Sequence, residues 1–389
     1  MRRVWVWALR LLVALVAAAA CIAWINREEL VRLHAVNTLF EPDRIVSNFS
    51  AMNQAFLSRP VPRGDSDVRP LLEGYALTLP PDVMDWVEDR ALTSLIVLEK
   101  GAIVHEDYFL GTGPEDLRIG WSLAKSFLSA LLGVLIDEGS IATLDAPVTR
   151  YAPDLKGGAY DGASLRDVVQ MASGVEFNED YKDYHSDINR MGRVLARGGS
   201  MDGFAAGLTT QAGPPGELWR YVSIDTHVIG MVIRGATGRD IPDLLSEKII
   251  APLGLEAEPY ILSDGDGVSF ILGGLNLTSR DYARFGVMIE QNGRLGDRQI
   301  VPASWISQST RASAPTEPGQ TGYGYQWWVP EDAGPGEFLA RGVYGQYLYI
   351  DQMRDVVIVV TAADLDFNAS GRHRNNLNML RRLSRAASE

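Results

Sequence analysis

Beyond the N-terminal segment, the hydrophobic pattern is densest between Arg118 and Asp137, where Lys125 is the only charged residue. Apolar side chains recur from position 123 to position 136 without leaving a wide polar face, which predicts a helix buried on nearly all sides. We expect this helix to end at Gly139, because glycine readily adopts the left-handed conformation that follows a last helical turn. The rest of the chain should be organised around it.

Runs rich in β-branched and aromatic residues lie on both sides of this helix in the sequence. Residues 93–98 and 102–109 predict one hairpin, and residues 346–351 and 356–362 predict a second hairpin near the C-terminus. Residues 323–329 are a further candidate strand. Both ends of the globular region therefore contribute to a sheet.

The residues between these strands predict helices. Residues 164–174 begin with an N-cap serine and end with glycine, and residues 224–236 and 241–250 predict two more helices. Residues 372–387 carry leucines on one stripe and predict a closing amphipathic helix. We predict an α+β fold, in which an antiparallel sheet from both ends is flanked by helices and a helical subdomain is inserted at about residues 140–300.

The first 25 residues read as a membrane segment. Met1-Arg2-Arg3 precedes apolar residues from position 4 to position 25, interrupted only by Arg10, and the basic end should stay in the cytoplasm. We favour an uncleaved inner-membrane anchor; a signal cleaved near residues 18–20 and a lipoprotein site at Cys21 are the alternatives. In each case the bulk of the protein lies outside the cytoplasm, in the cell envelope or secreted.

Two further parts are expected after residues 1–25. Residues 26–79 include Pro60, Pro62 and Pro70, which favour extended or loop structure. We expect a stalk or extension there, followed by one domain over residues 80–389.

Composition removes several classes of function. The net charge of −13 argues against a nucleic-acid partner, which would need a basic face. The single cysteine, Cys21, rules out an internal disulfide framework. The five histidines lack the spacing of metal ligands, so we expect no metal site. We also expect no cofactor.

The candidate chemistry begins with Ser122 and Lys125, which lie three residues apart and therefore on one helical face. That spacing alone is a weak signal, but the chain places a lysine in its most apolar helix although arginine is its common cation. Burial lowers the pKa of an amine towards the range where it accepts a proton, and a hydroxyl beside such an amine can act as a nucleophile.

A second group follows the turn at residues 213–216. Tyr221 could exchange a proton with Lys125 if the two side chains were held close together, although a half-buried core aromatic is the alternative interpretation. Ser223 either caps the helix that follows or belongs to the same site, and the sequence leaves both open.

Together these motifs resemble those of a known superfamily. Ser122-x-x-Lys125, Tyr221-x-Ser223 and a glycine-bearing strand start at residues 341–346 have the order and spacing seen in serine β-lactamases and penicillin-binding proteins. The chain is similar to the class C branch, which also holds DD-peptidases, esterases and 6-aminohexanoate-dimer hydrolases. The likeness spans roughly residues 90–365.

The resemblance implies a role for each residue. Ser122 would be the acylated nucleophile, Lys125 its proton acceptor, and Tyr221 the group that relays the proton to the leaving amine or alcohol. The amides of Ser122 and Gln346 would form the oxyanion hole. Ser223 replaces an asparagine found in many members, as in the amide- and ester-hydrolysing variants.

The third motif departs from the lactamase pattern. Those enzymes have a cation in a Lys-Thr-Gly or His-x-Gly triplet, whereas this chain has Val343-Tyr344-Gly345, with Arg341 nearby. Tyr344 and Gly345 are still expected to contact substrate. By resemblance to the aminohexanoate-dimer hydrolases, so is Tyr181.

The leading hypothesis is a serine hydrolase that cleaves a small amide or ester through an acyl-enzyme, without a cofactor. One alternative is a β-lactamase or DD-peptidase acting on β-lactams or peptidoglycan. The other is a non-catalytic, membrane-tethered binding module.

Overall fold

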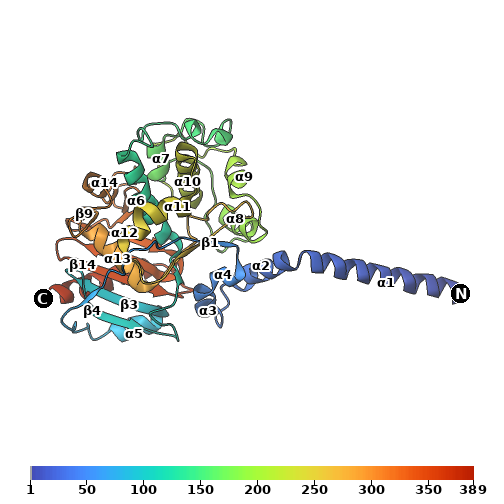
Figure 1. The fold of residues 1–389 in the computed structure, drawn as a ribbon, viewed down its shortest axis with the longest axis horizontal. Coiled ribbons are helices and arrows are strands. Elements are labelled where there is room, and N and C mark those ends of the chain that lie inside the picture. Colours follow the sequence, from blue (N-terminus) through green and yellow to red (C-terminus); the bar gives the residue numbers. More distant parts are fainter. Residues whose placement is uncertain (1) are drawn as a thin grey trace.

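Strands from both ends of the globular region meet in one sheet in the computed structural model, which describes residues 2–389 (Figure 1). Its eight strands have the order β10-β11-β12-β13-β14-β3-β4-β2, and all neighbours are antiparallel except β2 with β4. The strands are β2 (Leu72–Glu73), β3 (Leu92–Glu99), β4 (Ala102–Tyr108), β10 (Gly322–Tyr323), β11 (Trp328–Val329), β12 (Glu337–Gly342), β13 (Gln346–Asp351) and β14 (Val356–Ala362). The predicted α+β class and both predicted hairpins are confirmed.

One strand prediction is wrong in detail. Residues 323–329 do not form a single strand, because Gln326 adopts a left-handed backbone with φ of 64° and separates β10 from β11. The Gln326 side chain donates a hydrogen bond to the carbonyl of Val169 at 2.8 Å, which fixes this turn against the helical part of the molecule.

Strand β3 is buried on both faces. Leu95 lies in the core with helices α5 (Val83–Asp89) and α15 (Arg372–Ser388), whereas the next residue, Ile96, lies in the core with α13 (Ser279–Glu290) and α6 (Ala124–Asp137). Successive residues of a strand point to opposite faces, so a continuous apolar run suits a sheet that helices cover on both sides. Helix α15 is the predicted closing helix.

Helix α6 is the predicted buried helix. It follows a 3-10 turn (Trp121–Leu123) and ends before Gly139, whose φ is 76°. Phe127 stacks on Phe285 of α13 with ring centroids 3.7 Å apart. At Gly133 a Cβ atom would lie 2.3 Å from the ring of Trp305, in α14 (Ala303–Ser309), so glycine is required for this contact.

The helical part packs on the other side of α6 from the main sheet (Figure 1). It contains α7 (Leu165–Val169), α8 (Asp187–Ala196), α9 (Met201–Ala206), α10 (Ser223–Thr237), α11 (Ile241–Leu245) and α12 (Ala251–Leu253). The predicted helix at 241–250 is α11 followed by a π-helical turn (Ser246–Ile250).

The predicted limit of this insertion is too late in the chain. A second sheet of order β1-β6-β7-β5 closes it, formed by β1 (Ser58–Pro60), β5 (Arg118–Ile119), β6 (Tyr260–Leu262) and β7 (Leu275–Leu277). Helix α13 then packs on the main sheet, so the helical insertion ends before β7 instead of at about residue 300. A small hairpin, β8 (Arg294–Leu295) and β9 (Arg298–Gln299), follows.

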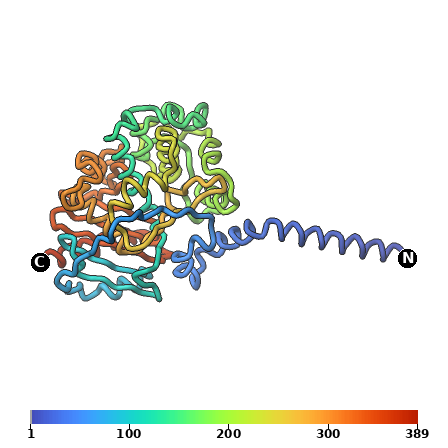
Figure 2. The backbone as a smooth tube through the Cα atoms, in the orientation of Figure 1, coloured from blue at the N-terminus to red at the C-terminus, as the bar shows by residue number. Residues whose placement is uncertain are grey.

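A long N-terminal helix projects from the body of the molecule (Figures 1 and 2). Helix α1 (Arg2–Ile25) is long and apolar enough to cross a membrane, and its side chains from Arg3 onward are exposed. Helix α2 (Arg27–Thr38) continues it, because Asn26 donates its N–H to Ile22 and accepts from Leu30. The two helices therefore form one nearly unbroken rod.

Residues 26–79 are not a stalk. After α2, helices α3 (Ile45–Ser50) and α4 (Met52–Ala55) bury Phe49 and Met52 in the main core, and strand β1 pairs with β6. Arg118 donates hydrogen bonds to the carbonyl of Val46 at 2.6 Å and to Ser50 at 2.8 Å. In this segment the apolar residues occur in short runs separated by polar residues and prolines. The local pattern therefore did not predict that they are buried.

Candidate active site

Ser122 lies in the 3-10 turn that leads into α6. The preceding residue, Trp121, adopts a left-handed backbone with φ of 47°, a conformation that costs a non-glycine residue about 1–2 kcal/mol. The turn packs closely on the main sheet, since a Cβ on Gly342 would lie 2.5 Å from the carbonyl oxygen of Gly120. Strand β12 thus supports the strained turn that presents Ser122.

Lys125 is one helical turn further on and only 2% exposed. Its Nζ donates a hydrogen bond to the carbonyl of Leu272 at 2.6 Å. Burial lowers the pKa of Lys125 to about 7, although the charges of Glu179 and Asp225 oppose the shift. A substantial fraction of this amine is therefore neutral near pH 7 and able to accept a proton.

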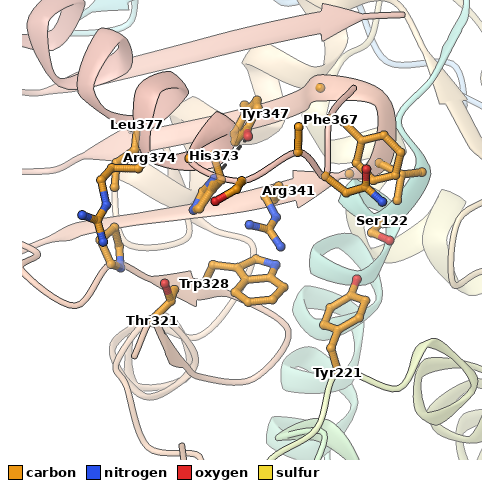
Figure 3. A pocket seen from close by; sticks show the side chains of 18 of the residues that line it. Ser122, Tyr221, Thr321, Trp328, Arg341, Tyr347, Phe367, His373, Arg374 and Leu377 are labelled. Carbon is orange, nitrogen blue, oxygen red and sulfur yellow. Dashed lines mark hydrogen bonds between the residues drawn. The ribbon is translucent and has the colours of Figure 1, made fainter. Parts of the chain in front are cut away.

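Tyr221 completes the group. Its phenol points towards Ser122 (Figure 3), and the Nζ of Lys125 lies 5.7 Å from the centre of its ring. Burial raises the pKa of Tyr221, while hydrogen bonding with Ser122 and the charge of Arg341 act in the opposite direction. The structure thus brings the three predicted catalytic side chains together.

Gln346, predicted to donate its backbone amide, is the first residue of β13 and is fully buried. Its side chain donates to the carbonyls of Tyr344 at 3.1 Å and Ala362 at 2.8 Å, and accepts from the amide of Ala362 at 3.1 Å. These bonds hold the turn in which Tyr344 and Gly345 have positive φ values of 61° and 89°. The side chain therefore fixes the backbone beside the Ser122 turn.

Tyr344 lies in a cluster of aromatic side chains. Its ring stacks on Phe40 at 4.6 Å, and it contacts Phe367 at 4.8 Å, Phe49 at 5.5 Å and Trp121 at 6.2 Å. Phe40 and Phe49 come from the N-terminal segment, which thereby reaches the turn that carries Ser122.

Ser223 and Tyr181 share one acceptor, Glu179. The Ser223 hydroxyl and the Tyr181 hydroxyl both donate to Glu179 Oε1, the latter at 2.8 Å, and the Ser223 N–H donates to Oε2 at 3.1 Å. Ser223 is the first residue of α10, with Val222 at the N-cap, so it does not serve as the cap. Sequence reasoning missed Glu179, because it lies in an acidic run that resembles an ordinary solvated loop.

Two cavities meet at Ser122. One, which we call the polar cleft, has a volume of about 1100 Å³ and is lined by Tyr221, Trp328, Arg341 and His373, among others (Figure 3). The other, the apolar chamber, has a volume of about 350 Å³. It is lined mainly by apolar residues, including Leu39, Phe40, Met52, Met191 and Phe270.

The predicted substrate contacts are divided between these cavities. Gly345 lines the polar cleft, Tyr344 and Ser223 line the apolar chamber, and Tyr181 lines both. Within residues 2–389 no group of three or more His, Cys, Asp or Glu side chains is arranged to hold a metal ion.

Fold and site together define the class, which is the serine β-lactamase-like superfamily, as the sequence motifs predicted. The chain belongs to the beta-lactamase family, whose model matches residues 89–382. It is a hydrolase of that family.

Similar proteins add detail. The 6-aminohexanoate-dimer hydrolase of Paenarthrobacter ureafaciens is 31% identical over 319 residues, which cover 78% of this chain and 81% of the relative. A Bacillus anthracis protein provisionally described as a 6-aminohexanoate-dimer hydrolase superposes with a TM-score of 0.76 at 23% identity, covering 89% of this chain and 95% of that one. A family VIII carboxylesterase superposes with a TM-score of 0.56 at 16% identity, over 80% and 99% of the two chains.

Proposed function

We propose that the protein is a serine hydrolase that cleaves small amides or esters through an acyl-enzyme on Ser122. The observation that carries this proposal is the meeting of Ser122, a buried Lys125 with a pKa of about 7, and Tyr221 at one point between two cavities. The similarity to an amide-cleaving relative and to an esterase supports the same reaction class.

In the proposed reaction, Ser122 Oγ attacks the carbonyl carbon of the substrate while its proton passes to the Lys125–Tyr221 pair. The backbone amides of Ser122 and Gln346 would donate hydrogen bonds to the oxyanion. The bond to the leaving nitrogen or oxygen then breaks, and that atom takes a proton from Tyr221. A water molecule, deprotonated by the same pair, releases the acyl group and restores Ser122.

A direct test is intact-mass spectrometry after treatment with a fluorophosphonate. The wild-type chain should gain one adduct, on the peptide that contains Ser122, whereas Ser122→Ala should gain none and keep its fold, because the change removes one hydroxyl. Labelling at another residue would overturn the assignment.

Substrate class is tested with a fluorogenic ester, a linear amide and a chromogenic cephalosporin side by side. We expect the ester or the amide to be turned over faster, because the Val343-Tyr344-Gly345 triplet lacks the lactamase cation. Cephalosporin turnover far above both would favour a β-lactamase. Absence of turnover with all three, despite labelling, would favour a binding module.

We also propose that α1 is a retained inner-membrane anchor with the catalytic domain outside the cytoplasm. Its length and apolar character and its continuity with α2 support this placement. The mass of the mature protein tests it: an unprocessed N-terminus in the membrane fraction is expected, and loss of residues 1–20 would indicate a cleaved signal or a lipoprotein.

A further inference from the structure

The apolar chamber is built partly by the segment that follows the membrane helix. Leu39 and Phe40 lie just after α2, and Met52 and Phe56 lie in and just after α4; all four line the chamber. The facing wall comes from α8, where Met191 is an example. The chamber therefore lies between the N-terminal segment and the helical insertion.

Specific contacts hold these walls together. Arg32 of α2 donates to the carbonyl of Ala196, at the end of α8, at 2.8 Å. Asn48 donates to the carbonyls of Thr38 and Leu39 at 3.2 and 3.0 Å, which fixes the chain where it leaves α2. The chamber is thus a preformed cavity, as binding sites for small molecules commonly are.

The proton relay decides which half of the substrate occupies the chamber. Tyr221, which would protonate the leaving group, lines the polar cleft and does not line the chamber, whereas Ser122 lines both. The leaving alcohol or amine must therefore depart into the polar cleft. The acyl group lies on the other side of the carbonyl carbon and therefore binds in the chamber.

We propose that the physiological substrates are esters or amides with an unbranched, apolar acyl chain of medium length, which binds in the chamber beneath the segment after α2. This inference rests on the proposed function and adds the chemistry of the acyl group. Apolar walls favour a hydrocarbon chain, because each buried methylene contributes about 0.8 kcal/mol, a factor of roughly three to four in affinity.

Such acyl compounds come either from the aqueous phase or from the membrane in which α1 would lie. Val36 lines the chamber and follows Ile25 by eleven helical positions, so the chamber lies about 16 Å along the rod from the end of α1. A chain of this kind could reach the site from either source.

The test uses the full chain in phosphatidylcholine vesicles and the p-nitrophenyl esters of acetate, butyrate, octanoate and dodecanoate. kcat/KM should rise roughly threefold for each methylene from acetate towards octanoate. The p-nitrophenyl octanoate supplied in solution is compared with the same ester preloaded into the vesicles. The rise along the series supports the proposal, and the form that reacts faster identifies the source of the substrate.

Gly192 of α8 offers a variant that fills the chamber. It lines the cavity, and a Cβ placed on it meets no atom within 4 Å; replacing a helical glycine also favours the helix. In Gly192→Phe the octanoate-to-acetate ratio of kcat/KM should fall at least tenfold, and in the matched Gly192→Ala it should change by less than about threefold. Val36 lies in α2, on the wall opposite α8, and Val36→Trp should lower the ratio as Gly192→Phe does.

The outcomes separate the two proposals. If Ser122→Ala cleaves acetate as well as the wild type does, the proposed function itself fails. If acetate turnover depends on Ser122 but the rate is flat along the series, or an aromatic acyl ester is preferred to octanoate, the acyl-chain proposal is overturned. An unchanged ratio in both filling variants would also overturn it.

Discussion

The two cavities that meet at Ser122 differ in both chemistry and origin. The polar cleft is lined by residues of the main sheet and of helix α15, together with Glu179, Tyr181 and Tyr221 of the helical part, and it contains several arginines. The apolar chamber is formed by the N-terminal segment and the helical insertion. Ser122 and Lys125 lie at the start of α6 and Tyr221 lies just before α10, where the two cavities meet, whereas much of the apolar wall comes from the segment that runs from α2 to α4.

The electrostatics of the polar cleft centre on Arg341. Its guanidinium lies over the ring of Trp328 at 4.3 Å, and no ion pair joins it to a carboxylate within residues 2–389. Arg381, by contrast, is paired with Glu337 at 2.6 Å. Burial, aided by the charge of Arg341, lowers the pKa of His373 to about 3, so this histidine is neutral at physiological pH. Arg341 is therefore, with Arg374, a cation that lines the polar cleft without an ion pair among residues 2–389.

The largest effect is expected from Lys125→Arg, which should stop the turnover of all substrates, whichever cavity their groups occupy. Arginine keeps the charge but cannot lose its proton, so a loss above about 10³-fold is expected in kcat/KM, the upper part of the range for a proton-transfer group. Appreciable residual activity would contradict a proton-accepting lysine.

The wild-type pH profile checks the same residue. In the proposed reaction Lys125 accepts a proton in its neutral form, so kcat/KM should be flat above a pH of about 7 and fall tenfold per unit below it. Glu179 and Asp225 are the acidic groups that act on this amine. A profile that stays flat down to pH 5 would exclude the assignment.

The next largest effect is expected from Tyr221→Phe. Removing the phenol should slow turnover by about 10²–10⁴-fold, the usual scale of general acid–base help. The loss should be greater for an amide than for a p-nitrophenyl ester, whose leaving group needs no proton. Equal losses of a few-fold for both would mean that Tyr221 serves packing alone.

Arg341→Gln sharpens the comparison on the polar side. A hydrogen bond to a charged group contributes about 1.5–3 kcal/mol, so kcat/KM should fall at least tenfold for a substrate with a carboxylate on its leaving group. A matched substrate with a neutral amide at that place should change about threefold or less. Equal losses for both would assign Arg341 to a structural role beside Trp328.

The smallest effect is expected on the apolar side, from Phe40→Ala. This side chain is 36% exposed and stacks on Tyr344, so its loss opens the chamber without removing a buried core residue. The octanoate-to-acetate ratio of kcat/KM should fall about threefold, as for the loss of contact with one methylene. A rise in this ratio would show that Phe40 restricts the chamber.

The elements predicted correctly from sequence are those whose signal is local. Helix α6, helix α15 and the two hairpins follow from hydrophobic spacing within short windows. The motifs of Ser122, Lys125 and Tyr221 likewise predicted side chains that lie close together in the fold, while their catalytic roles stay a prediction. The pairing of β1 with β6 joins residues some 200 positions apart, and Phe49 packs against Trp121 and Tyr344 from distant parts of the chain; no local pattern records such contacts. Glu179 was missed for a similar reason, because its partner Ser223 lies 44 residues away.

The nearly unbroken rod of α1 and α2 has a practical consequence. Trimming the chain just before the main sheet would give a version that needs no detergent. It would also delete one wall of the apolar chamber together with the anchor. Because the deleted segment includes Phe49 and Met52 of the main core, such a trimmed enzyme should be less stable as well as less selective among acyl donors. A cut between α1 and α2, near Asn26, is the place where the hydrophobic helix can be removed while the pocket wall is retained.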